Sequence, residues 1–136
     1  MSGVRQISLW KQVLRVEGAV LVSSEYDPTR TVLIFDLRLD GRAAVRCGRC
    51  QAPSPGYDGG RAQPRCWRGL DLGSTRVLLR SRVPRVRCAE HGVTAAAVPW
   101  ARHGSRFTRA FEDTLAWLAT RAAKTTIAEL MRTTWR

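Results

Sequence analysis

Residues 47–50 read Cys-Gly-Arg-Cys, and residues 88–91 read Cys-Ala-Glu-His. In each stretch a metal-binding side chain stands at either end of a short turn, so both can face the same ion. Together they supply three thiolates and one imidazole, which fill the tetrahedral shell of a structural zinc ion and leave no position for water. We therefore expect one structural Zn²⁺, bound by Cys47, Cys50, Cys88 and His91.

Two other interpretations of these cysteines stay open. A redox Cys-x-x-Cys motif normally starts a helix at its first cysteine, whereas the Pro- and Gly-containing residues 51–56 favour a loop. Unliganded, buried cysteines are the second alternative, and the long insert between Cys50 and Cys88 weakens the zinc signal. The remaining cysteine, Cys66, fits better as a small apolar residue beside Trp67 than as a ligand.

The chain before the first cysteine pair predicts a β-hairpin. Apolar residues alternate along residues 14–23 and, more regularly, along 31–39, where every second residue from 33 to 39 is Leu or Phe. The Tyr-Asp-Pro-Thr segment at 26–29 supplies turn chemistry between these two strands.

Between the cysteine pairs we expect a loop and then two short strands. Residues 51–64 are rich in Pro, Gly and Ala, which is typical of a loop. Residues 75–80 and 82–88 have strand composition and are expected to join near Ser81.

The last part of the chain predicts two helices. Thr108 can cap a first helix whose apolar positions are spaced by four and three residues. Thr126 and Glu129 have capping-box spacing, so a second helix is expected there, after a turn at Lys124 and Thr125. The predicted fold class is α+β, with a β-hairpin region at 1–45, a small zinc-ribbon-like β domain at 46–100 and an incomplete helix-turn-helix at 101–136.

The chain is strongly basic, with 23 Lys plus Arg against 11 Asp plus Glu and a formal net charge of +12. Such a field attracts polyanions, and Arg, which outnumbers Lys here, forms bidentate contacts with phosphate. Codon usage in a GC-rich genome could explain the preference for Arg but not the net charge. The candidate nucleic-acid contacts lie on the second of the two short strands, in the segment before them and around the start of the first helix. They are Arg68, Arg82, Arg85, Arg87, Arg102, Arg106 and Arg109, and a solvated basic surface is the alternative for each.

Other features bear on compartment and packing. The first residues carry no leader-like apolar stretch, and no apolar run is long enough to span a bilayer, so we expect a cytoplasmic chain in which cysteines bind metal rather than form disulfides. Trp100 and Trp117 are expected in the core, and His103 at the surface.

An ordered set of motifs extends across the chain. The Cys47–Cys50 pair is followed by Trp-Arg-Gly-Leu-Asp at 67–71, Arg-Val-Arg-Cys-Ala-Glu-His-Gly-Val at 85–93, Val-Pro-Trp-Ala at 98–101, Ser-Arg-Phe-Thr at 105–108 and Phe-Glu at 111–112. This set resembles the N-terminal region of ISL-three family insertion-sequence transposases. The resemblance covers about residues 8–136, and the stretch 47–112 is its specific part.

The resemblance implies a function and a set of partners. In that family the two cysteine-containing pairs form a zinc-binding segment, and helix-turn-helix units that follow bind the terminal inverted repeats of the element. A catalytic domain with an Asp-Asp-Glu site comes later. The chain ends at Arg136, where a third helix is expected, so the resemblance implies a truncated, DNA-binding part without catalytic residues. Whether it forms a homodimer is left open.

Two other classes of function remain to be weighed. A stand-alone zinc-ribbon adaptor that binds nucleic acid or docks on a protein would have its helices packed back on the ribbon. A small zinc enzyme would need an open metal position, and four protein ligands leave none.

Overall fold

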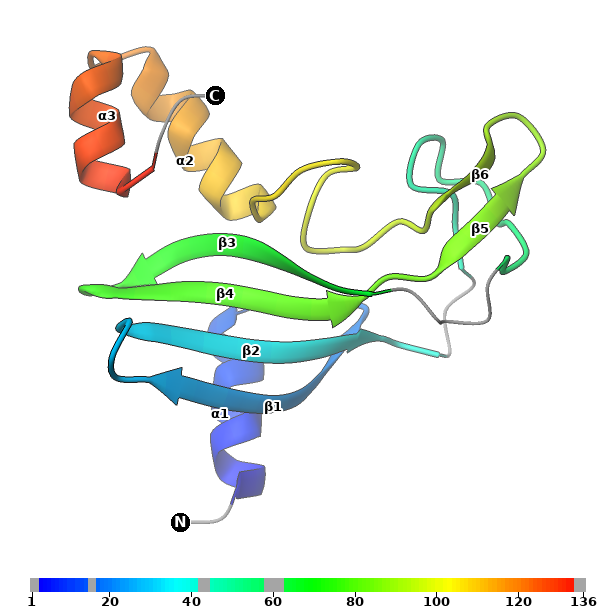
Figure 1. The fold of residues 1–136 in the computed structure, drawn as a ribbon, viewed down its shortest axis with the longest axis horizontal. Helices are drawn as coiled ribbons and strands as arrows, with labels where there is room; N and C mark the ends of the chain where they lie inside the picture. The colour runs from blue at the N-terminus through cyan, green and yellow to red at the C-terminus, as the bar shows by residue number, and fades with distance from the viewer. Residues whose placement is uncertain (1–2, 15–16, 42–44, 58–62, 134–136) are drawn as a thin grey trace.

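The computed structural model describes residues 3–14, 17–41, 45–57 and 63–133. Its fold is α+β, as predicted, with a central sheet, a small hairpin at one end of it and a pair of helices beside it (Figure 1). The elements in chain order are α1 (Gly3–Leu14), β1 (Ala19–Asp27), β2 (Val32–Leu39), β3 (Pro64–Leu72), β4 (Thr75–Arg82), β5 (Arg85–Cys88), β6 (Gly92–Ala95), α2 (Arg109–Ala119) and α3 (Lys124–Met131).

The central sheet has the strand order β1-β2-β4-β3. β1 and β2 are antiparallel, as are β3 and β4, whereas β2 and β4 run parallel. Both central strands therefore end at the same edge of the sheet, the edge that faces the β5–β6 hairpin (Figure 1). The sheet thus joins strands from the first and second of the three expected segments.

The predicted hairpin before the cysteine pairs is confirmed, with one correction at its start. The Asp27 side chain accepts hydrogen bonds from the backbone N–H groups of Thr29 and Arg30 at 3.0 and 3.2 Å, which builds the turn. The expected strand start at Leu14 is wrong, because Leu14 ends helix α1; residues 15 and 16 lie outside the described residues. The helix packs on the sheet through Trp10, whose ring centroid lies 5.2 Å from that of Phe35.

One face of the sheet carries the main core. The alternation along β2 places Phe35 and Leu37 inside it, together with Trp67 of β3 and Leu79 of β4. Trp67 also meets the buried Trp100 edge to face at 5.3 Å, so the segment after β6 is held against the sheet.

Two strands differ from the prediction. β3 begins at Pro64, the last residue of the expected loop, and it includes the whole 67–71 motif, for which no strand was predicted. β4 continues to Arg82, and β5 starts at Arg85, so the break between the strands falls at Val83 and Pro84 rather than near Ser81. Pro84 lacks an N–H for a ladder bond, which suits a break.

The two helices enclose a small core of their own. The Thr108 hydroxyl accepts a hydrogen bond from the N–H of Phe111 at 3.2 Å, which confirms the predicted cap of α2. The predicted capping box is wrong, since α3 begins at Lys124 after the N-cap residue Ala123. The buried side chains of this second core are Phe111, Ile127 and Met131.

Among the described residues, no helix has both the length and the apolar character that crossing a bilayer requires.

Candidate metal centre and nucleic-acid surface

The first cysteine pair sits in a compact turn that backbone hydrogen bonds close. The N–H of Gln51 donates to the Cys47 carbonyl and the N–H of Cys47 donates to the Ala52 carbonyl, each at 2.9 Å. The N–H of Arg49 points at Cys47 Sγ over 3.4 Å. These bonds turn both cysteine side chains toward the same point, and Gln51 takes up a positive φ of 66° to complete the turn.

The second pair lies at the end of the β5–β6 hairpin. Cys88 ends β5, and Gly92 begins β6 with a φ of 68°, a conformation that glycine adopts without strain. The first turn is docked on this hairpin, because the N–H of Gly48 donates to the Ala95 carbonyl at 3.0 Å. The isolated bridge between Cys47 and Ala96, with this hydrogen bond, brings the pairs together despite the long insert between them.

The four predicted ligands form one cluster. Their ligand atoms all lie within 4.8 Å of one another. Cys50 Sγ is 3.6 Å from Cys88 Sγ, and His91 Nδ1 is 3.7 Å from Cys88 Sγ. His91 Nδ1 is 3.8 Å from Cys47 Sγ. Ligands at zinc–sulfur and zinc–nitrogen bond lengths around one tetrahedral ion lie about 3.5–3.8 Å apart, so the cluster fits structural zinc.

The electrostatics of the cluster favour a metal-binding thiolate at Cys88. Backbone N–H groups of His91 and Glu90, and the His91 side chain, stabilise the thiolate and lower the pKa of Cys88 to about 6. At Cys50 a hydrogen bond with the Ala52 backbone favours the thiolate. Desolvation and the neighbouring sulfurs of Cys88 and Cys47 outweigh that bond and raise the pKa of Cys50.

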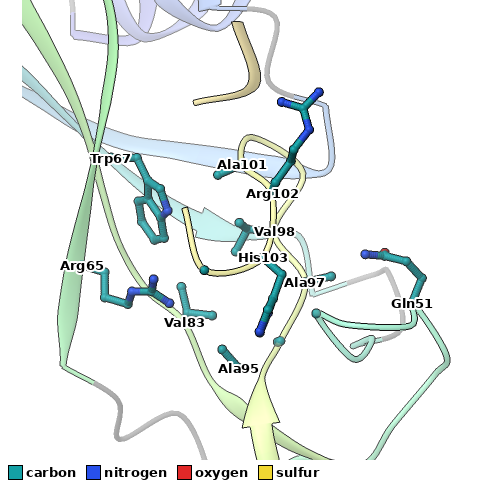
Figure 2. Close-up of a pocket in the computed structure, with 13 residues that line it drawn as sticks. Gln51, Arg65, Trp67, Val83, Ala95, Ala97, Val98, Ala101, Arg102 and His103 are labelled. Carbon is teal, nitrogen blue, oxygen red and sulfur yellow. The ribbon is translucent and has the colours of Figure 1, made fainter. Parts of the chain in front are cut away.

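No second cluster of this kind is present across residues 3–14, 17–41, 45–57 and 63–133, where no other three His, Cys, Asp or Glu side chains lie close enough to share an ion. Cys66 stands apart from the four, exposed on β3. Next to the cluster lies a small pocket of about 20 Å³. Figure 2 shows His103 on one side of it and Trp67 with Arg65 on the other. That volume holds about one water molecule, so the pocket is too small for an organic substrate.

Two of the seven candidate arginines share one exposed face of the hairpin. Arg85 and Arg87 alternate with the buried Val86 and Cys88 along β5. Their guanidinium carbons lie 5.1 and 5.3 Å from the ring centroid of Tyr57, whose exposed ring stands with them on this face. Sequence reasoning missed Tyr57, because the backbone bond from its N–H to the Arg85 carbonyl joins segments far apart in the chain.

The other four outward-facing candidates lie at the sheet edge and around the start of α2. Arg82 ends β4, and Arg106 and Arg109 are exposed just before and at the start of α2. Arg102 is exposed too, but its guanidinium pairs with Asp113 at 2.9 Å and Glu112 at 3.3 Å.

Arg68 faces inward instead. Its guanidinium lies 5.3 Å from the Phe111 ring centroid and donates to the carbonyls of Met131 and Arg132 at 2.9 and 3.1 Å. It also pairs with Asp71 at 3.1 Å, and 14% of its side chain is exposed. This arrangement fastens the end of α3 to β3 and leaves little of Arg68 for a ligand.

The two tryptophans differ in environment. Trp100 is buried, as expected. The prediction that Trp117 is a core residue is wrong: it is 57% exposed, and the Arg121 guanidinium stacks on it at 4.2 Å.

Comparison with known proteins agrees with this architecture. Residues 43–91 match the zinc-finger of transposase IS204/IS1001/IS1096/IS1165, and residues 96–136 match the helix-turn-helix domain of transposase family ISL3. No solved structure matches the chain.

Two curated relatives are each named "Transposase for insertion sequence element IS1557", from Mycobacterium tuberculosis strains CDC 1551 / Oshkosh and ATCC 25618 / H37Rv. Each is 42% identical to this chain over 138 residues. The alignment covers 98% of this chain and 31% of the relative, so the chain spans about a third of the length of the curated relatives it matches. With a metal cluster that fits zinc and a helix pair that follows it, the chain carries the zinc-finger and helix-turn-helix segments of ISL3-family transposases.

Proposed function

We propose that these residues form the DNA-binding part of a transposase, which acts in the cytoplasm on the ends of an insertion sequence. In this proposal one zinc ion is bound by Cys47, Cys50, Cys88 and His91. It holds the turn at residues 47–50 against the β5–β6 hairpin, because a hairpin of this size has little hydrophobic core of its own. Cleavage and joining of DNA strands are assigned to a separate Asp-Asp-Glu domain of the transposase.

The observation that carries the proposal is the exposed face of β5. Arg85 and Arg87 share this face, and their guanidinium carbons lie 5.1 and 5.3 Å from the ring centroid of the exposed Tyr57. Paired guanidinium groups suit phosphates, and an exposed aromatic ring suits the sugar or base beside them. Arg106 and Arg109 add positive charge at the start of α2, where a helix N-terminus also favours phosphate.

The exposed groups in this proposal suit phosphates more than base edges. Binding should therefore weaken steeply as salt rises and discriminate modestly between sequences. The test is fluorescence anisotropy of the zinc-loaded chain with duplexes of the terminal repeats and of scrambled sequence, over a range of salt concentrations.

A salt-dependent affinity with a small preference for the repeats supports the proposal. A strong preference for the repeats would show that base edges are read and would overturn the phosphate-only part of it. A zinc-loaded chain without affinity for either duplex would favour the alternative, a zinc-ribbon adaptor that docks on a protein. The adaptor predicts helices packed back on the ribbon domain of residues 46–100, and α2 contacts β3 within that span, so the binding assay and not this packing separates the two proposals.

A further inference from the structure

A groove of about 420 Å³ lies at the edge of the sheet where β2 and β4 end. Among the described residues, three arginines from separate parts of the chain line it: Arg46 of the first metal-binding turn, Arg82 at the end of β4 and Arg109 at the start of α2. Asp40 is the acidic residue in that part of the lining. The groove therefore collects more positive than negative charge at one place.

The topology explains why these residues meet. The parallel pairing of β2 with β4 brings the ends of both strands, and so Arg82, to the edge that faces the ribbon (Figure 1). The turn that carries Arg46 is fastened to the segment after β6, because the N–H of Ala97 donates to the Arg46 carbonyl at 2.8 Å. The N–H of Arg109 donates to the Trp100 carbonyl at 2.9 Å, which fixes the start of α2 against the same segment.

Arg46 and Arg109 are well placed to bind an anionic ligand. One terminal nitrogen of Arg46 donates to the Gln51 carbonyl at 2.9 Å, which orients the group while its other N–H donors remain. Arg109 is exposed in the first turn of α2. Pro84 also lines the groove, so the groove begins directly beside Arg85 and the exposed face of β5.

We propose that this groove binds the phosphodiester backbone of DNA between the ribbon and the helix pair, with Arg46 and Arg109 as phosphate contacts. The inference rests on the proposed DNA binding and adds a site to it, in which Arg46 is a contact that the motif pattern does not point to. An open groove with three guanidinium groups suits a continuous chain of phosphates better than a compact neutral ligand.

The first test removes the two charges. Arg46→Gln with Arg109→Gln is compared with the charge-matched variant Arg30→Gln with Arg76→Gln, whose residues lie at the opposite end of β2 and β4. Duplex affinity is measured by anisotropy on the zinc-loaded chain of residues 1–136. We expect the slope of log K against log salt to fall by about 1.8 for the groove variant, since each lost phosphate contact removes about 0.9. The control should keep nearly the wild-type slope.

The second test leaves every arginine in place, because Arg46 also braces the metal-binding turn. Val45 lines the groove and is 39% exposed, so we expect the fold to tolerate polar substitutions there. Val45→Glu should weaken duplex binding by placing a carboxylate beside the phosphates, while the neutral Val45→Gln should bind like the wild type.

The outcomes separate the two proposals. A wild-type, zinc-loaded chain that binds no duplex overturns the proposed function and the groove with it. The groove proposal is overturned, and the proposed DNA binding stands, on a second set of results. In these, the wild type binds the duplex, the Arg46/Arg109 variant loses no more of the salt slope than the Arg30/Arg76 control, and Val45→Glu binds as tightly as Val45→Gln.

Discussion

The imidazole of His103 lies directly against the backbone of Gly48, so close that a Cβ at position 48 would stand 2.5 Å from His103 Nδ1. The same Cβ would stand 2.7 Å from the carbonyl oxygen of Ala95. The contact joins the first metal-binding turn to the loop that leads into α2. His103 is exposed, as expected, but it has a neighbour that the sequence did not indicate.

Gly48→Ala should therefore destabilise the protein. A Cβ that meets both a ring and a backbone carbonyl forces the metal-binding turn away from β6, at a cost of about 1–3 kcal/mol in the free energy of unfolding. Denaturant unfolding of zinc-loaded protein measures this cost. His103→Ala in the same background should restore only part of the loss, because the Ala95 carbonyl stays. Gly56→Ala, where a Cβ meets nothing within 4 Å, is the control; equal stability of the Gly48 and Gly56 variants would contradict the packing.

Asp71→Asn should loosen the helix pair from the sheet. Asp71 binds Arg132 at 2.7 Å and Arg68 at 3.1 Å, and Arg68 holds the last carbonyls of α3. Losing a carboxylate shared by two partly buried guanidinium groups should cost about 2 kcal/mol, less than for a fully buried pair. Amide hydrogen exchange in α3 should rise relative to exchange in β4.

Asp113→Asn is the matched control for this change, since Asp113 pairs with Arg102 at an exposed site and its loss should cost under about 0.5 kcal/mol. If α3 is protected equally in the Asp71 and Asp113 variants, the Asp71 network does not position the helix pair.

The pair of Asp36 and Arg80 should make stability depend on pH. Asp36 faces Arg80 in the β2–β4 register, with Arg80 Nε 2.6 Å from Asp36 Oδ1. Hydrogen bonds from Arg80, and from the Ser23 hydroxyl, hold the pKa of Asp36 below its ordinary value of 3.8. A carboxyl with a depressed folded-state pKa contributes stability above its unfolded pKa, and the contribution disappears as pH falls through the folded value.

The measurement is the difference in unfolding free energy between wild type and Asp36→Asn. We expect about 1 kcal/mol at neutral pH, the upper end for a partly exposed pair, shrinking only below pH 3.8. Both proteins lose zinc in acid, so the difference between them isolates the carboxylate. If this difference in unfolding free energy instead vanished near neutral pH, its pH dependence would come from a titrating group other than Asp36.

Arg85→Gln with Arg87→Gln should weaken DNA binding without loss of zinc. Removing two phosphate contacts should lower the salt slope by about 1.8. Tyr57→Phe should retain binding because the ring stays beside both positions, whereas Tyr57→Ala should weaken it. Anisotropy titrations check these values, and an unchanged slope in the double arginine variant would exclude the β5 face from the interface.

The features that the sequence predicted correctly are those that depend on local residue patterns. The period-two alternation along residues 33–39 predicted strand β2 and the hairpin, and the Thr108 cap predicted the start of α2. The two-residue gaps within each cysteine pair predicted a cluster whose atoms do lie together. These features depend on neighbours within a few residues, which a single sequence displays.

The misses concern contacts between distant segments. The strand nature of the 67–71 motif follows from pairing with β4, and the groove follows from the parallel register of β2 and β4. The inward turn of Arg68 depends on carbonyls at the end of α3, more than sixty positions away. The capping-box spacing at Thr126 was a local signal that misplaced the helix start: the N-cap is Ala123, so α3 begins at Lys124, three residues earlier than a cap at Thr126 predicts.

The most direct test of the whole account is the zinc-to-protein ratio of the freshly purified, reduced chain by native mass spectrometry. We predict one zinc per chain, kept in Cys66→Ser, whose side chain lies outside the cluster, and lost in Cys88→Ser. A wild-type chain that is folded without zinc, or a Cys88→Ser variant that still carries one, would contradict it.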